Sequence, residues 1–197
     1  RAAFKEIWNP YAAYAEGGTV KDPKMFYGRG HFIQNLLSVM HNAPATKSIV
    51  IYGQKRVGKS SVLYYLKRQL KPPVIPVDFS IGEIIEGFSL ATFLYRIIQR
   101  LEDELETLAD ESHERINVQR PTLTQLQQNA QIVFHDYMAS LRRRLSQTDT
   151  LRDARIMLLI DEFSYIYSEI IRGRVSDTFM KSWKAMLAPG YCGCVVV

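Results

Sequence analysis

The segment Gly53–Ser60 combines two glycines, a lysine and a hydroxyl group at the spacing G-x-x-x-x-G-K-[ST]. A β-branched run, Ser48–Tyr52, precedes it and predicts a short buried strand, and residues 59–70 predict a helix that ends before Pro72-Pro73. A helix N-terminus offers unpaired N–H groups and the positive end of the helix dipole, and glycines let the backbone bend closely around an anion. The spacing and its strand–helix context therefore predict a loop that holds the phosphates of a nucleotide.

The side chains of this loop have separate expected roles. Lys59 is expected to reach the β- and γ-phosphates, which makes it a candidate catalytic residue, and the Ser60 hydroxyl is expected to ligate Mg²⁺. Lys55 and Arg56 add positive charge at the rim, where they either touch the γ-phosphate or stay in solvent. The competing interpretation is a glycine-rich turn with a surface lysine. The candidate nucleotide-binding residues of the loop are Gly53, Gln54, Lys55, Arg56, Val57, Gly58, Lys59, Ser60 and Ser61.

A second motif is an apolar strand that ends in two carboxylates. Arg155–Ile160 predicts a strand buried on both faces, and Asp161 and Glu162 follow it. We expect Asp161 to hold the magnesium shell beside Ser60, and Glu162 to polarise the attacking water as a general base. A helix cap is the alternative role, because strands that end in Asp are common in α/β proteins.

Strand and helix patterns alternate along the whole chain. Val74–Phe79 predicts a further strand, in which Pro76 favours a position at the sheet edge or a β-bulge. Alternating strands and helices predict an α/β fold with a parallel sheet covered by helices on both faces. Further helices are expected over residues 30–42, from Ser89, from Pro121 and around Trp183, and a last strand at Cys192–Val197.

Composition places few limits on function. The chain has 197 residues, enough for one domain, and its net charge of +5 permits contact with nucleic acid at a basic run such as Arg142–Arg144, although a solvated surface is the default. Two cysteines, Cys192 and Cys194, provide no secreted disulfide framework, which favours a cytoplasmic location. No apolar run approaches the roughly 20 residues that span a bilayer, so no membrane partner is expected.

Three segments together resemble a known family. Met25-Phe26-Tyr27-Gly28-Arg29 precedes a predicted helix, Ile51–Ser61 contains the phosphate loop, and Asp161-Glu162 ends the apolar strand. These segments resemble the AAA-like branch of P-loop ATPases, in particular the STAND group of signal-transducing ATPases and their archaeal-type and origin-recognition relatives. The resemblance covers most of residues 9–197.

The resemblance implies a P-loop NTPase three-layer sandwich of the AAA-like, additional-strand type, with ATP (or ADP) and Mg²⁺ as ligands. In that family Phe26, Tyr27 and Arg29 would lie beside the adenine, and Asn9-Pro10-Tyr11 resembles a short box that helps to close the pocket. Alternatively, Phe26 and Tyr27 pack under the sheet and Arg29 begins a helix. Residues 1–30 would form a lead-in to the nucleotide pocket, and residues 31–197 would form the ATPase core.

The ends of the chain suggest a piece of a larger protein, because it begins at Arg1 and stops within an apolar run at Val197. The C-terminal part of the domain, with the family's sensors, arginine finger and lid, is then expected beyond Val197. Arg172 and Arg174 either approach a neighbouring subunit's phosphate or face solvent. The resemblance implies an ATP-dependent switch or assembly module of a signalling protein, which self-associates or contacts other domains. The alternatives are a DNA-associated ATPase and a domain that binds nucleotide without turnover.

Overall fold

Four parallel strands form the centre of the protein, and their spatial order is β1-β4-β3-β2. The computed structural model describes residues 12–14, 18–42, 48–112 and 116–197, so the Asn9-Pro10-Tyr11 box lies outside the described residues. β4 separates β1, which leads into the phosphate loop, from β3, which leads into the acidic pair. The strands are β1 (Ser48–Val50), β2 (Val74–Ser80), β3 (Arg155–Asp161) and β4 (Cys192–Val196).

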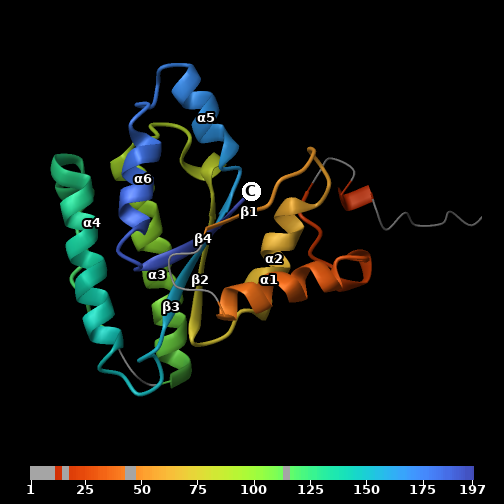
Figure 1. Cartoon of the computed structure of the whole chain (residues 1–197), viewed down its shortest axis with the longest axis horizontal. Coiled ribbons are helices and arrows are strands. Elements are labelled where there is room, and N and C mark those ends of the chain that lie inside the picture. Colours follow the sequence, from red (N-terminus) through yellow and green to blue (C-terminus); the bar gives the residue numbers. More distant parts are fainter. Residues whose placement is uncertain (1–11, 15–17, 43–47, 113–115) are drawn as a thin grey trace, which may run out of the picture.

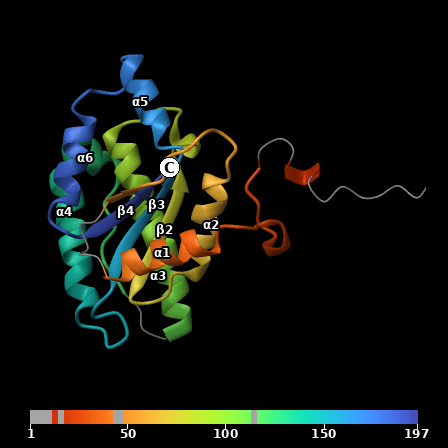
Figure 2. The ribbon, with the colours of Figure 1, turned by 45° about the vertical axis from the view of Figure 1, so that its right-hand side comes forward.

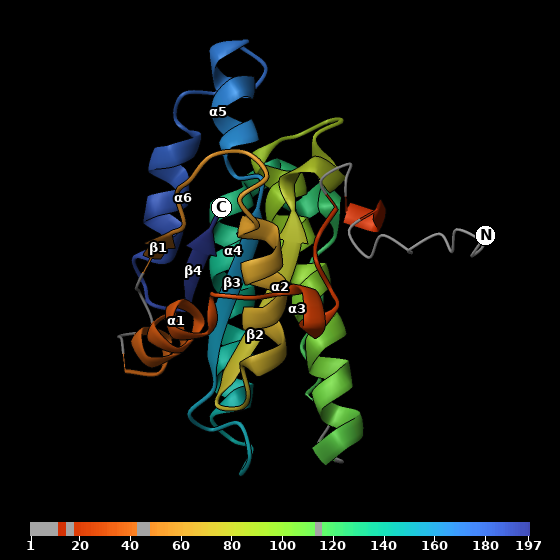
Figure 3. The ribbon, with the colours of Figure 1, turned by 90° about the vertical axis from the view of Figure 1, so that its right-hand side faces the viewer.

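The helices are α1 (Gly30–Asn42), α2 (Lys59–Gln69), α3 (Leu90–Ser112), α4 (Leu123–Leu145), α5 (Ser164–Ile171) and α6 (Phe179–Leu187). Figure 1 shows α1 and α2 on one face of the sheet and α3, α4 and α6 on the other, and Figure 3 looks at the face that α1 and α2 cover. In Figure 2, α5 extends beyond the edge at which β3 ends. The sheet is therefore the middle of three layers, which confirms the predicted P-loop sandwich. Short 3₁₀ turns lie at Ala12–Tyr14, Pro23–Met25 and Ile81–Ile84.

Alternation along the central strands divides the core into two clusters. On β3, Met157 and Leu159 pack with α1 and α2, whereas Ile156, Leu158 and Ile160 pack with α3, α4 and α6. All five side chains are buried, as the continuous apolar composition of this strand predicts. β4 divides in the same way, with Val195 on the first face and Cys192, Cys194 and Val196 on the second.

The two edge strands of the sheet, β2 and β1, differ in how far neighbouring side chains cover them. β2 is an edge strand, as Pro76 predicts. Lys67 of α2 donates hydrogen bonds to Asp78 of β2 and to Glu104 of α3, so it links the two helical layers around that edge. Although burial opposes its charge, these two carboxylates raise the pKa of Lys67. β1, at the opposite edge, is only three residues long and leaves Val50 70% exposed.

Element boundaries differ from the predictions in small ways. β1 ends at Val50, although Ile51 still donates its N–H to the Val196 carbonyl at 2.9 Å before the chain turns into the loop. The helix expected from Pro121 begins at Leu123, because Thr122 caps it through the amide of Gln125. Within the described part of the chain, no helix is sufficiently long and apolar to cross a bilayer.

α5 is the helix that the sequence pattern did not predict. It has only eight residues, of which Ile166 and Glu169 are buried. Tyr165, Tyr167 and Ile171 are exposed, so apolar residues do not mark one buried face. Without that periodicity, the segment has no helical signature in the sequence.

Phe93 on α3 is the centre of the larger core cluster, and replacing it tests the packing. Its ring centroid lies 5.2 Å from that of Trp183 and 5.4 Å from that of Phe179, and the side chain is fully buried. We expect Phe93→Ala to lower the free energy of unfolding by about 3–5 kcal/mol, because it leaves a cavity among these rings. Chemical denaturation measures this loss. Ile132→Ala on α4, where the side chain is 58% exposed, is the control and should change stability by less than about 1 kcal/mol. Equal losses in the two variants would contradict the assigned core.

Candidate phosphate-binding site

The loop between β1 and α2 closes around the ammonium group of its own lysine. Lys59 Nζ donates to the carbonyl oxygens of Gly53 at 3.1 Å and Gln54 at 2.9 Å. This brings the charge of the first residue of α2 back over the start of the loop. Lys55 and Arg56 are exposed at the rim, as expected. Positive charge from three side chains therefore gathers at the carboxyl end of β1, on a loop whose carbonyl groups hold the Lys59 ammonium.

Both glycines of the pattern are required by the loop's shape. A Cβ on Gly53 would lie 3.3 Å from Val57 Cγ2 and 3.9 Å from Lys59 Cδ, within the space that the loop encloses. Gly58 has φ +86°, a left-handed conformation that side chains disfavour, and it immediately precedes α2. Arg56 also has positive φ, at 66°, so the loop is tightly wound on both sides of Val57.

The first turn of α2 lacks a side-chain cap. Gly58 occupies the cap position and has no side-chain hydrogen bond to the helix, and the first intrahelical bond joins the Val62 amide to the Gly58 carbonyl at 3.0 Å. The N–H groups that precede Val62 point along the helix axis toward the loop. An uncapped N-terminus beside a lysine is the arrangement that attracts phosphate oxygens.

The N-terminal lead-in is attached to this loop by two hydrogen bonds. Ser61 is buried, and its hydroxyl accepts from the Val20 amide at 2.9 Å. Arg29, which directly precedes α1, donates from its guanidinium to the Val57 carbonyl. The predicted lead-in therefore contacts the phosphate loop at Val57 and the first turn of α2 at Ser61.

The aromatic pair before Arg29 divides between core and surface. Phe26 stacks on Tyr65 of α2, with ring centroids 4.0 Å apart, and packs against the smaller core cluster. Tyr27 is 76% exposed. Phe26 thus matches the alternative in which it packs within the fold, while its place beside adenine stays a prediction.

Asp161 and Glu162 follow β3 at the same edge of the sheet as the loop. β4 is the single strand between β3 and β1, which places the two motifs about 10 Å apart across the sheet. Asp161 Oδ1 accepts from the Glu162 amide at 2.9 Å, and this bond turns the chain sharply at the strand end. Glu162 itself has φ 56°, an uncommon conformation for a residue with a side chain.

The Glu162 carboxylate leans away from the phosphate loop, toward the end of β2. It accepts a hydrogen bond from the Ser80 hydroxyl and contacts the Tyr165 hydroxyl of α5. A Cβ on Gly82 would lie only 2.5 Å from Glu162 Oε2, so the glycine makes room for the carboxylate. Ser80, Gly82 and Tyr165 were not singled out in the sequence, because their positions acquire meaning only when β2 pairs with β3.

Arg172 and Arg174 follow α5 and bind one buried carboxylate. Glu169, 5% exposed, accepts from Arg172 Nη1 at 2.9 Å and from Arg174 Nη1 at 3.3 Å. Both arginine side chains are otherwise more than half exposed. These two ion pairs hold the segment between α5 and α6 against α5.

The fold and the loop define the class of P-loop NTPase domains. A family model described as AAA domain matches residues 44–194, which is more than half of the chain. The chain therefore belongs to the AAA domain family and is a nucleotide-binding P-loop domain. This confirms the AAA-like part of the resemblance, and the STAND or origin-recognition subgroup stays a prediction. The comparisons found no matching curated protein and no matching solved structure.

The contact between Glu162 and Tyr165 gives a pH-dependent signal of the carboxylate's position. The Glu162 charge, and then its hydrogen bond, raise the pKa of the Tyr165 phenol above its ordinary value of 10.0. We expect Glu162→Gln to lower the pKa of Tyr165 toward 10.0, so the phenol ionises at lower pH. NMR titration of ¹³Cζ-labelled tyrosine, with the Tyr165→Phe spectrum for assignment, measures this change. Asp103→Asn on α3 is the control, and an unchanged Tyr165 titration in Glu162→Gln would contradict the contact.

Proposed function

We propose that the chain binds ATP together with Mg²⁺ at the loop Gly53–Ser61 and hydrolyses it. The observation that carries this proposal is the Lys59 ammonium, held on the carbonyls of Gly53 and Gln54 beside the uncapped N-terminus of α2. Positive charge and the N–H groups of the first helical turn lie together there, at the edge of the sheet that also carries Asp161 and Glu162.

Phosphate binding requires few rearrangements in this loop. The backbone N–H groups at the start of α2 bind phosphate oxygens, and Lys59 exchanges its two carbonyl acceptors for the β- and γ-phosphates. Lys55 and Arg56, exposed at the rim, raise the local positive potential and attract the anion. Gly53 and Gly58 keep side chains out of the space that the phosphates occupy.

Mg²⁺ is implied by the family, and the residues present fit it. Ser60 lies in the first turn of α2 and Asp161 at the end of β3, and both offer oxygen, the ligand type that Mg²⁺ prefers. Among the described residues, Asp161 accepts a hydrogen bond from the Glu162 amide at Oδ1, which leaves Oδ2 for a metal ion. When bound, the ion would neutralise phosphate charge during transfer to water. The chain contributes a hydroxyl and a carboxylate to hold it.

Glu162 is the proposed general base, and its position has a consequence for turnover. Its carboxylate is bonded to Ser80 on the β2 side of β3, whereas the phosphate loop follows β1 on the other side. To accept a proton from water beside the γ-phosphate, the side chain must leave Ser80 and Tyr165. We infer that hydrolysis includes this rotation.

Recognition of adenine is proposed at the lead-in, where Arg29 is bonded to the loop backbone and Tyr27 is exposed. The wider role that we propose is a nucleotide-dependent switch in a larger cytoplasmic signalling protein of the STAND type, with self-association or other domains as partners. The DNA-associated alternative depends on the exposed run Arg142–Arg144, which also suits the negative end of the α4 dipole. That structural role accounts for the run without nucleic acid.

Replacement of Lys59 tests nucleotide binding. We expect Lys59→Ala to weaken Mg²⁺-ATP binding by about 100-fold or more, because phosphate oxygens lose their charged donor. Isothermal titration calorimetry measures the affinity, and thermal unfolding checks that the loop variant is folded. Lys55→Ala, which removes an exposed charge from the same loop, should change the affinity by less than about tenfold. Undiminished affinity in Lys59→Ala would exclude the assignment.

Replacement of Glu162 separates binding from turnover. Glu162→Gln keeps the size of the side chain but removes its basicity, so ATP affinity should stay within about threefold while hydrolysis falls by about 10²–10⁴-fold. Phosphate release under single-turnover conditions measures hydrolysis. Turnover that survives in this variant would remove Glu162 as the base. A parent chain that binds ATP without any turnover would instead identify a domain that uses nucleotide structurally.

A further inference from the structure

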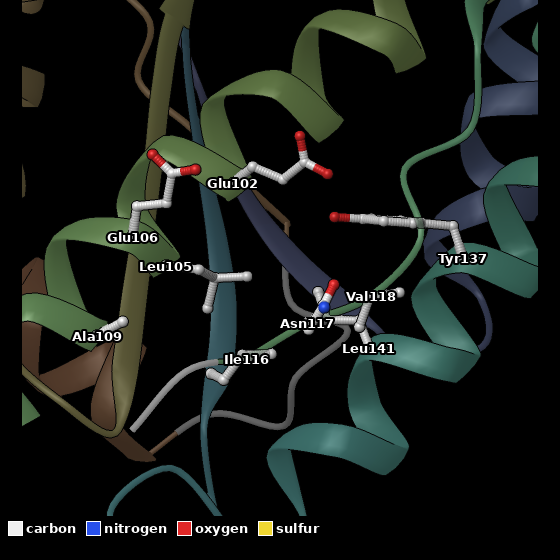
Figure 4. Close-up of a pocket in the computed structure, with 9 residues that line it drawn as sticks. All are labelled: Glu102, Leu105, Glu106, Ala109, Ile116, Asn117, Val118, Tyr137 and Leu141. Atoms are coloured by element: carbon white, nitrogen blue, oxygen red, sulfur yellow. The ribbon is translucent and has the colours of Figure 1, made fainter. Parts of the chain in front are cut away.

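A hollow of about 570 Å³ lies between α3 and α4, on the face of the sheet opposite α2. α3 contributes Glu102, Leu105, Glu106 and Ala109, α4 contributes Tyr137 and Leu141, and the segment before α4 contributes Ile116, Asn117 and Val118 (Figure 4). This volume falls within the range of roughly 300–1,000 Å³ that small-molecule sites occupy. None of these residues belongs to the phosphate loop or the acidic pair.

Polar and apolar side chains both line the hollow. In Figure 4 the carboxylate of Glu102 points toward the Tyr137 hydroxyl, while Leu105, Ile116 and Leu141 lie lower in the view, where the Asn117 amide lies close to Val118 and Leu141. Glu102 and the Tyr137 hydroxyl are hydrogen bonded. A ligand that fills the hollow therefore meets acceptors at one end and hydrocarbon at the other.

Charge in this hollow is negative and incompletely compensated. Glu102 and Glu106 are four residues apart, so both lie on the same face of α3. Arg120 pairs with Glu102 at 3.3 Å, and its guanidinium is already stacked over the Tyr95 ring at 4.8 Å. Glu106 takes part in no ion pair among the described residues. Two carboxylates therefore line the hollow, and Arg120 forms an ion pair with one of them, Glu102.

The protonation behaviour of Glu102 agrees with this excess of negative charge. Burial raises the pKa of its carboxyl above the ordinary value, and Glu106 and Asp103 raise it further, in spite of Arg120. A second positive charge placed near Glu102 and Glu106 would relieve this repulsion, whereas an anion would increase it. The apolar wall also requires the bound molecule to carry a hydrocarbon part.

We propose that the hollow between α3 and α4 binds an organic cation, whose ammonium or amidinium group contacts Glu102 and Glu106 while its apolar part packs against Leu105, Ile116 and Leu141. This site is independent of the nucleotide: it lies on the other face of the sheet and shares no residue with the phosphate loop. Its occupancy can therefore be measured without ATP, and failure of one proposal leaves the other intact.

The probes are 2-phenylethylamine, which is positively charged at neutral pH, and its neutral analogue 2-phenylethanol. We expect the amine to bind with a dissociation constant in the millimolar range, which is ordinary for a ligand of this size, and about ten times more tightly than the alcohol. Amide chemical-shift changes in a ¹H–¹⁵N NMR titration of the whole chain should concentrate in α3, α4 and residues 116–118. Equal binding of amine and alcohol, or shift changes elsewhere, would overturn the proposal.

Matched variants on α3 locate the charged group. Glu106→Gln removes a carboxylate that is exposed and free of ion pairs, and should weaken amine binding by about 3–10-fold without affecting the alcohol. Asp103→Asn removes a carboxylate from the same helix outside the hollow. Because Asp103 acts on Glu102 only through its charge, this variant should weaken amine binding less than Glu106→Gln does. Ala109→Leu, which reduces the free volume, should weaken both probes. Amine binding that is insensitive to both Glu106→Gln and Ala109→Leu would exclude this hollow as the site.

Discussion

The common direction of the four strands is the constraint on which the candidate site depends. Because β1, β4, β3 and β2 are parallel and in register, every strand ends at the same edge of the sheet. The phosphate loop follows β1, the acidic pair lies at the end of β3 and Ser80 ends β2, so residues about 110 positions apart in the sequence lie along one edge. No helix contact could substitute for this arrangement, since the ladder of backbone hydrogen bonds fixes each strand end to its neighbour. The helices on both faces of the sheet exclude water from these backbone hydrogen bonds.

Along this edge, the polar side chains of the candidate site are hydrogen bonded to other groups of the protein. Lys59 is held on loop carbonyls, and Glu162 is held on Ser80. Both groups are polar, and both occupy positions that a substrate would oblige them to leave. Both groups therefore have hydrogen-bond partners within the protein, which avoids unpaired charge at the surface. Under the proposed function, both groups would exchange these partners when phosphate binds.

The sequence predicted the layers of the fold and the class of the phosphate loop well, but it did not predict which side chains contact one another along the strand ends. The buried strand at Arg155–Ile160, the edge position of Pro76 and the loop at Gly53–Ser60 each follow from a local pattern whose physical cause is local. Ser80 and Tyr165 lie beyond such reasoning, because hydroxyl groups are common and only the pairing of β2 with β3 brings these to Glu162. α5 was missed because its exposed face carries Tyr167 and Ile171, which hides any amphipathic period. In the lead-in, Phe26 packs inside the fold and Arg29 directly precedes α1 while its guanidinium contacts the loop, and the adenine role of both stays a prediction.

The two margins of the sheet differ in how they would receive another strand. An incoming backbone at β2 would meet Pro76, which has no N–H to donate, and the ion cluster of Lys67, Asp78 and Glu104, which would lose solvent and partners. At β1, by contrast, the backbone is free of such obstacles, and Val50 and Tyr52 are 70% and 97% exposed. The two edges of the sheet therefore differ in whether they can accept another strand. The β2 edge disfavours strand addition, and a strand added at the β1 edge would lie beside the segment that leads into the phosphate loop. Because β1 is a single short strand, the binding of a strand at this edge would depend on the conformation of the phosphate loop that follows β1.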